Sequence, residues 1–467
     1  MEKATTYKYG VETSMNKYAG KDFSKGSVKR HIISLAVPMT VAQLVQMAYN
    51  LVDRIYLGHL SQDDSITLTA VGLTFPIIMF ISAFTNLFGM GGAPLCSIAR
   101  GKGDKERAEK ILGNTFGMLC IFSVLLMLVS YVFMKPLLFL FGASTGSFPI
   151  ARDYLMIYLI GTPAAMLSTG MNGFINIQGF AKTGMATTVI GAILNIILDP
   201  FFIFVLGFGV KGAAIATVIA QVVSAVWVLR FVTGKKTELG LKKANIIPDF
   251  RIVSEITGLG IAGFVMSAST GIVQAACNST LKNFGGDVYV GIMTVLSSLR
   301  DFLFLPASGV TSGAQPVIGF NYGAGKYDRI KEAIRFSSIV TVIYIAFAWA
   351  LLHLFPEIFI RIFNSDAELV TKGTDALRLY FFGFVFMALQ IAGQSTFIGM
   401  GLSKHAIFFS VLRKVLIVVP LTLILPHIGG LGVDGVFLAE PVSNVVGGTC
   451  CYIVMLITLA RLFKKGK

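Results

Sequence analysis

The chain has 467 residues, of which 55% are hydrophobic and only 13% charged, whereas soluble domains carry about 25% charged residues. This composition excludes a soluble globular protein and places the chain in a lipid bilayer. The net charge of +15 does not indicate a nucleic-acid partner, because the basic residues lie between apolar runs and not on an aromatic-rich surface.

Apolar runs of about 20 residues recur along the chain, and each can cross a hydrocarbon core of about 30 Å as a helix. The first run begins at Ile32, after about 30 mostly polar residues, so we expect no cleaved secretion signal. The predicted fold class is an all-α integral membrane protein with about twelve transmembrane helices. They are expected at residues 31–58, 66–94, 112–141, 151–178, 184–207, 211–232, 254–281, 290–319, 334–361, 375–401, 405–426 and 433–460.

Segments rich in lysine and arginine alternate with segments that hold few. Seven basic residues precede the first span, five lie between Arg100 and Lys110, and six lie in the segment 230–251. Basic residues accumulate in cytoplasmic loops. These segments and both termini are therefore predicted to face the cytoplasm, in agreement with an even number of spans.

The two halves of the chain repeat each other at an offset of about 222 residues. Tyr158 corresponds to Tyr380 and Gly161 to Gly383. Corresponding loops have the same charge pattern, so the repeats are parallel, and we predict two six-helix lobes around a central cleft. The predicted boundaries are a cytoplasmic tail at 1–30, an N-lobe at 31–232, a cytoplasmic linker at 233–250, a C-lobe at 251–461 and a second tail at 462–467.

Two acidic residues lie within predicted spans of the N-lobe. Asp53 ends a polar stripe on the first span, and Asp199 follows Asn195 by one turn on the fifth and precedes Pro200. A carboxylate at membrane depth costs several kcal/mol unless it is paired, hydrated or protonated, so these acids indicate a function. Their oxygens suit a hard cation such as Na+, and a desolvated carboxyl also suits a proton carrier. Both alternatives stay open, and a salt bridge to Arg54 is the structural alternative.

The other polar residues of the spans either join helices to one another or line a cavity. Arg413 and Glu440 of the C-lobe form a buried structural pair, or Glu440 offers its charge to cationic substrates. Pro38 marks a hinge in the first span. The residues predicted to line a substrate cavity are Gln46, Asn50, Asn172, Asn176, Gln274, Gln394, Arg413 and Glu440.

Four patterns together resemble the multidrug and toxic compound extrusion (MATE) family over essentially the whole chain. They are Tyr49-Asn50-Leu51-Val52-Asp53 with Gly58, the run from Leu194 to Pro200, the run from Gly313 to Ala324, and a Gly-x-x-Gly start to the last span of each half. The two acids of the N-lobe, together with the absence of an acid from the seventh predicted span, resemble the DinF branch of this family and particularly its MepA-like multidrug exporters. The resemblance implies two lobes around a V-shaped cavity that alternates between inward and outward openings. It also implies a cation site formed by Asp53, Tyr154, Asn195, Asp199 and Thr217.

The predicted function is an antiporter in which inward-moving H+ or Na+ drives the export of small, amphiphilic, mostly cationic drugs. The alternative is a flippase of a lipid-linked saccharide, which has the same architecture but needs several basic residues to hold a pyrophosphate. We predict no enzyme activity, no cofactor, no nucleic-acid partner and no metal site beyond a Na+ held by Asp53, Asn195 and Asp199. The protein is expected to be a monomer among the lipids of the bacterial cytoplasmic membrane.

Overall fold

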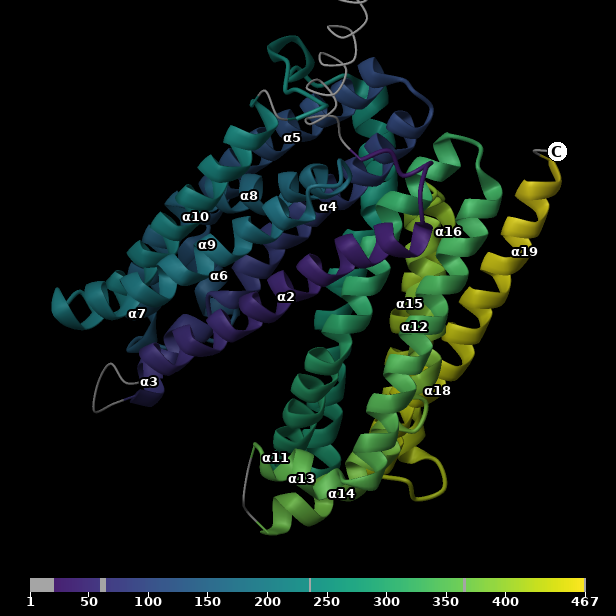
Figure 1. Ribbon diagram of the computed structural model, residues 1–467. Coiled ribbons are helices and arrows are strands. Elements are labelled where there is room, and N and C mark those ends of the chain that lie inside the picture. Colours follow the sequence, from purple (N-terminus) through teal and green to yellow (C-terminus); the bar gives the residue numbers. More distant parts are fainter. Residues whose placement is uncertain (1–20, 59–63, 235–236, 364–366, 466–467) are drawn as a thin grey trace, which may run out of the picture. The chain divides into compact units, whose positions relative to one another are not determined.

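The computed structural model describes residues 21–58, 64–234, 237–363 and 367–465, and these residues are almost entirely helical (Figure 1). The α-helices are α2 (Val28–Gly58), α3 (Asp64–Gly72), α4 (Phe75–Gly101), α5 (Lys105–Val132), α6 (Met134–Leu140), α7 (Ser147–Ile160), α8 (Thr162–Asn176), α9 (Ala181–Pro200), α10 (Val210–Val232), α11 (Phe250–Gly323), α12 (Tyr327–Leu354), α13 (Pro356–Arg361), α14 (Ala367–Phe381), α15 (Phe384–Gly399), α16 (Ser403–Val411), α17 (Val419–Ile424), α18 (Val433–Ser443) and α19 (Thr449–Lys465). Short π-helical turns are η1 (Phe201–Val205), η3 (Leu412–Val418) and η5 (Asn444–Gly448), and 3-10 turns are η2 (Lys243–Asn245) and η4 (Leu425–His427).

Within the described ranges, ten helical segments are long and apolar enough to cross a membrane, and two bent helix pairs raise this number to twelve. The bent pairs are α7 with α8, at 55°, and α14 with α15, at 44°. α11 contains two of the spans, because Gly286 interrupts it with a φ of 72°, which glycine adopts without steric cost. The prediction of an all-α membrane fold with about twelve spans is confirmed.

A glycine lies at the joint of each bent pair, and the two glycines occupy corresponding positions of the sequence repeat. Gly161 joins α7 to α8, and Gly383 precedes α15. A Cβ atom at Gly383 would lie 2.5 Å from the carbonyl oxygen of Pro441, and one at Gly161 would overlap Gln221. The absence of a side chain therefore lets a neighbouring helix approach each bend closely.

α5 shows how the apolar sequence separates into a buried face and a lipid-facing face. Leu125, Leu128 and Val132 follow each other at helical spacing and are exposed, with 53% exposure at Leu128 and 74% at Val132. Leu119 and Leu126 are buried in the protein core. A helix that presents a continuous apolar stripe outward is stable when lipid covers that stripe.

The described chain forms two compact units. The first comprises Val41–Thr257 with the segment up to Lys25, and the second comprises Gly26–Thr40 with the chain from Gly258 onward. The start of α2 therefore packs in the second unit, where a Cβ atom at Gly313 of α11 would lie 2.7 Å from the backbone nitrogen of Ala36. The sequence repeat does not reveal that the start of α2 belongs to the second unit, because the repeat assigns the whole of α2 to the predicted N-lobe.

Each unit has its own apolar core. In the first unit α4, α5, α8 and α10 lie side by side (Figure 1), around buried side chains such as Phe88, Leu112 and Phe174. α10 also contacts α7 and α9, and this packing brings the polar faces of α7, α9 and α10 together. In the second unit α14 packs against α18 over a core that includes Leu377 and Phe437.

Candidate functional site

The end of α9 places Asp199 inside the first unit. Its side chain is completely buried, with 0% exposure. The next residue, Pro200, has no N–H to donate to the carbonyl four residues earlier, and the helix widens directly afterwards into the π-helical turn η1. Turns of this kind within helices are frequent at functional sites. The local sequence therefore opens the helical hydrogen-bond pattern next to the carboxylate.

The polar atoms around Asp199 are mainly oxygens. Both of its carboxylate oxygens lack a hydrogen-bond donor among the described residues, while the Asp53 carboxyl of α2 lies close enough to interact with it. Asn195 is 2% exposed and donates a hydrogen bond of 3.2 Å from Nδ2 to Oγ1 of Thr217 on α10. Its own Oδ1 has no donor within the described structure. This group is rich in acceptors that a bound cation or a proton would satisfy.

Three tyrosines complete this group. Tyr49 of α2 and Tyr154 and Tyr158 of α7 all interact electrostatically with Asp53. The Tyr154 and Tyr158 rings are stacked with their centroids 5.9 Å apart, and the Tyr49 side chain also lies near that of Thr217. We refer to Tyr49, Asp53, Tyr154, Tyr158, Asn195, Asp199 and Thr217 together as the acidic site.

The sequence analysis did not select Tyr49 and Tyr158. The signal was present, because Tyr49 precedes Asp53 by four residues and Tyr158 follows Tyr154 by four, which places each pair on one helix face. All five residues of the predicted cation site lie in the acidic site.

Buried charge decides what the acidic site can do. Two interacting carboxyls inside a protein both stay ionised only when a cation lies with them, and otherwise a proton neutralises one of them. Carboxylate, amide and hydroxyl oxygens are the ligands that hard cations prefer. Across the described ranges, no cluster of three or more His, Cys, Asp or Glu side chains could hold a metal ion. The predicted alternative partner, the Arg54 side chain, lies outside the described part of the structure.

The remaining polar residues predicted for the first unit lie in two other places. Gln46 donates a hydrogen bond of 3.4 Å to Asn50 on the exposed face of α2. Asn172 donates one of 3.2 Å to the Gly184 carbonyl, and a Cβ atom at Gly184 would overlap the side-chain oxygens of Asn172 and Asn176. Asn172 and Asn176 therefore lie where α8 packs against α9, and the described contacts do not bring them to Asp199.

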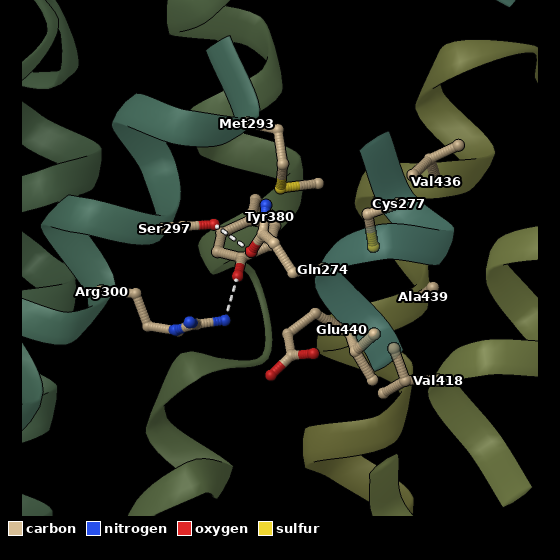
Figure 2. A pocket seen from close by; sticks show the side chains of 11 residues that line it. Gln274, Cys277, Met293, Ser297, Arg300, Tyr380, Val418, Val436, Ala439 and Glu440 are labelled. Carbon is tan, nitrogen blue, oxygen red and sulfur yellow. Dashed lines mark hydrogen bonds between the residues drawn. The ribbon is translucent and has the colours of Figure 1, made fainter. Parts of the chain in front are cut away.

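A small polar cavity of about 10 Å³ lies in the second unit (Figure 2). Gln274 and Ser297 line it and are joined by a hydrogen bond of 3.3 Å from Ser297. Arg300, which also lines the cavity, donates a hydrogen bond of 2.8 Å to the Tyr380 hydroxyl, and Glu440 also reaches the cavity. This volume is at the lower limit of what admits one water molecule.

The carboxylate of Glu440 is held by two cations. Arg413 lies 3.0 Å from it and Lys414 lies 3.5 Å from it, and all three side chains are almost fully buried. Arg413 also donates a hydrogen bond of 2.7 Å to Asn444. The two cations come from η3, and η5 begins at Asn444. Gln394, another predicted cavity residue, is buried and donates to Ser410.

Comparisons with known proteins place this geometry in a family context. A model of the MatE family matches residues 38–201 and 258–424. The multidrug export protein MepA of Staphylococcus haemolyticus is 24% identical over 443 residues, which cover 93% of this chain and 94% of the relative. The MepA protein of Staphylococcus saprophyticus is 24% identical over 94% of this chain and 96% of its own length. The outward-facing structure of a multidrug resistance MATE family transporter of the MOP superfamily is similar with a TM-score of 0.87, at 25% identity over 94% of this chain and 97% of that one.

Proposed function

The chain belongs to the MATE family of membrane transporters, and we propose that it exports organic cations and drugs in exchange for H+ or Na+ bound at the acidic site. The family assignment predicted from the four sequence patterns is confirmed, and the chain is a transporter and not an enzyme. Its assignment to the DinF branch stays a prediction.

The burial of Asp199 is the observation that carries this proposal. A carboxylate with 0% exposure and no hydrogen-bond donor on either oxygen within the described residues would be unstable as a permanent anion, because nothing replaces its lost hydration. It is stable when a cation binds or a proton joins it. The site therefore has two states of different charge, which ion coupling requires.

Exchange follows if the drug and the coupling ion favour different conformations. A ligand shifts a conformational equilibrium only by the difference between its affinities for the two states. The ion would bind the acidic site in the outward-open state, release the drug there and return inward with the gradient. A membrane potential contributes about 2.3 kcal/mol per charge for each 100 mV, enough to set the direction of transport.

The relatives support a drug as the cargo. Two staphylococcal relatives that align with more than nine-tenths of this chain are multidrug export proteins. We propose the same class of substrate for this chain, small amphiphilic compounds that carry positive charge, and a location in the bacterial cytoplasmic membrane with both termini inside. The alternative of a lipid-linked saccharide flippase has less support, since Arg413 and Lys414 are occupied by Glu440.

Reconstituted vesicles test the proposal directly. The purified chain is placed in liposomes, and ethidium transport is followed by fluorescence after a proton gradient or a sodium gradient is imposed separately. We expect one of the two gradients to drive ethidium transport by the wild type, and Asp199→Asn to abolish the gradient-driven component. The gradient that works identifies the coupling ion.

Asp328→Asn is the matched control, because this carboxylate lies on α12 with 97% exposure and makes only a surface contact with Lys331. It should transport ethidium at the wild-type rate. Folded wild-type protein that moves ethidium under neither gradient would refute drug antiport. Full coupling in Asp199→Asn would refute the assignment of the acidic site.

A further inference from the structure

A polar stripe runs along the second half of α11, between Val288 and Gly323. Thr294, Ser298, Asp301 and Ser308 are exposed or half-exposed and follow each other at spacings of four, three and seven residues, which places them on one face of the helix. The Thr294 and Ser298 hydroxyls donate to carbonyls of their own helix, at 3.0 and 2.8 Å. They are therefore satisfied within the helix and do not join it to a neighbouring helix.

The stripe lies at membrane depth. This segment is one of the apolar helices that can span a bilayer. At 1.5 Å per residue, Asp301 lies about 20 Å from the Val288 end and about 33 Å from the Gly323 end. Mostly apolar residues extend from it in both directions. A carboxylate at this depth is costly against lipid, so this face of the helix is expected to border a water-filled pathway.

Arg300 holds the Asp301 carboxylate in place. The Arg300 side chain is only 10% exposed, whereas that of Asp301 is 66% exposed. Nε and Nη2 of Arg300 donate to Oδ1 of Asp301 at 3.1 and 2.9 Å, and Nη1 donates to the Tyr380 hydroxyl at 2.8 Å. Arg300 is thus fixed from the protein interior, and the described bonds to Asp301 all end on one of its two oxygens. The carboxylate is oriented while most of its surface stays accessible.

Another acid within an apolar helix of the second unit is already paired. Glu440 is buried, and Arg413 and Lys414 neutralise its charge. It therefore has little attraction left for a cationic substrate. Phe302, next to Asp301, exposes about half of its aromatic side chain, and an aromatic ring near an acid suits a compound that is both apolar and positively charged.

From this geometry we propose that Asp301 is a substrate-binding residue, whose carboxylate contacts the positive group of the exported compound along the polar stripe of α11. The inference deepens the proposed export function and rests on it. The acidic site would bind the coupling ion and Asp301 would bind the drug, so the ion and the drug would be bound by different carboxylates. A competing role for Asp301 is structural, as the counter-ion that neutralises Arg300.

Binding of tetraphenylphosphonium, a permanent cation, separates these roles. Its affinity is measured with the purified full chain, together with the thermal unfolding temperature with and without Na+ and at acidic and neutral pH. We expect Asp301→Asn to raise the Kd about tenfold, as loss of one accessible charge contact would do. Asp301→Glu should restore most of the affinity, and the response of the unfolding temperature to Na+ and to pH should stay that of the wild type.

A second variant keeps the test valid if Asp301→Asn does not fold. Ser298→Lys leaves the Arg300–Asp301 pair intact and places a positive charge on the same helix face, one turn away. It should also raise the Kd about tenfold, whereas Asp328→Asn should bind as the wild type does. Wild-type affinity in Asp301→Asn would overturn the inference, and so would wild-type affinity in Ser298→Lys where Asp301→Asn does not fold. A wild-type protein that neither binds nor exports the cation would instead overturn the proposed function.

Discussion

Replacement of Arg413 by Met tests whether the charged cluster of the second unit stabilises the fold or binds substrate. Arg413 lies 3.0 Å from the Glu440 carboxylate and donates to Asn444, while Lys414 lies 3.5 Å from the same carboxylate oxygen. In Arg413→Met, the carboxylate keeps only the more distant cation and Asn444 loses its donor. In Glu440→Gln, two buried cations lose the charge that neutralises both of them.

The structure ranks the costs of these changes. Breaking a buried ion pair from one side costs about 3–5 kcal/mol of unfolding free energy. Arg413→Met should lower the unfolding free energy by about 3 kcal/mol, because Lys414 still compensates the charge of Glu440. Glu440→Gln should lower it by an amount at the upper end of that range. A triple variant with Arg413→Met, Lys414→Met and Glu440→Leu removes all three charges of this cluster, so its unfolding free energy should lie within about 1–2 kcal/mol of the wild-type value.

Unfolding of the four proteins in the same detergent, followed by heating and by denaturant, measures this ranking. Tetraphenylphosphonium binding is measured in parallel and should change little in any folded variant. A triple variant at least as unstable as Arg413→Met would show that packing, and not charge, controls the effect. An Arg413→Met protein of normal stability that no longer binds the drug would show that the cluster faces the substrate.

Three further outcomes follow from local contacts. The Gln178 Oε1 atom accepts hydrogen bonds from the Thr237 hydroxyl and from two backbone N–H groups of the linker, so Gln178→Met should lower the unfolding free energy by about 1–3 kcal/mol. It should also increase deuterium exchange in the linker, and exchange equal to that of the wild type would contradict this role. Gly313→Val should destabilise the second unit by about 1–3 kcal/mol, because its added atoms meet the Ala36 backbone; a thermal unfolding midpoint like that of the wild type would show that α2 can move aside. Pro38 lies in α2 just before the change of unit at Thr40. Pro38→Ala restores a helical hydrogen bond and should therefore slow ethidium efflux several-fold while the drug affinity stays constant, whereas an unchanged efflux rate would argue against a hinge.

The spans and the pair of acids were visible in the sequence. Hydrophobicity over about 20 residues and helical spacing are local properties, and the bilayer selects helices that satisfy their own backbone. Asp53 and Asp199 were prominent for a related reason, since an acid in an apolar run has an energetic cost wherever the helices lie. Asn195 could be placed beside Asp199 because both lie on one helix face.

Contacts between distant segments were decided by the tertiary structure. The sequence left open whether Arg413 pairs with Glu440, and Lys414 as a second partner follows only from how η3 packs near α18. The difference between the exposed Asp301 and the buried Glu440 is likewise a matter of packing. Helical periodicity determines which residues share a face, but the partner of each face depends on close packing between helices far apart in the chain, which no local pattern specifies.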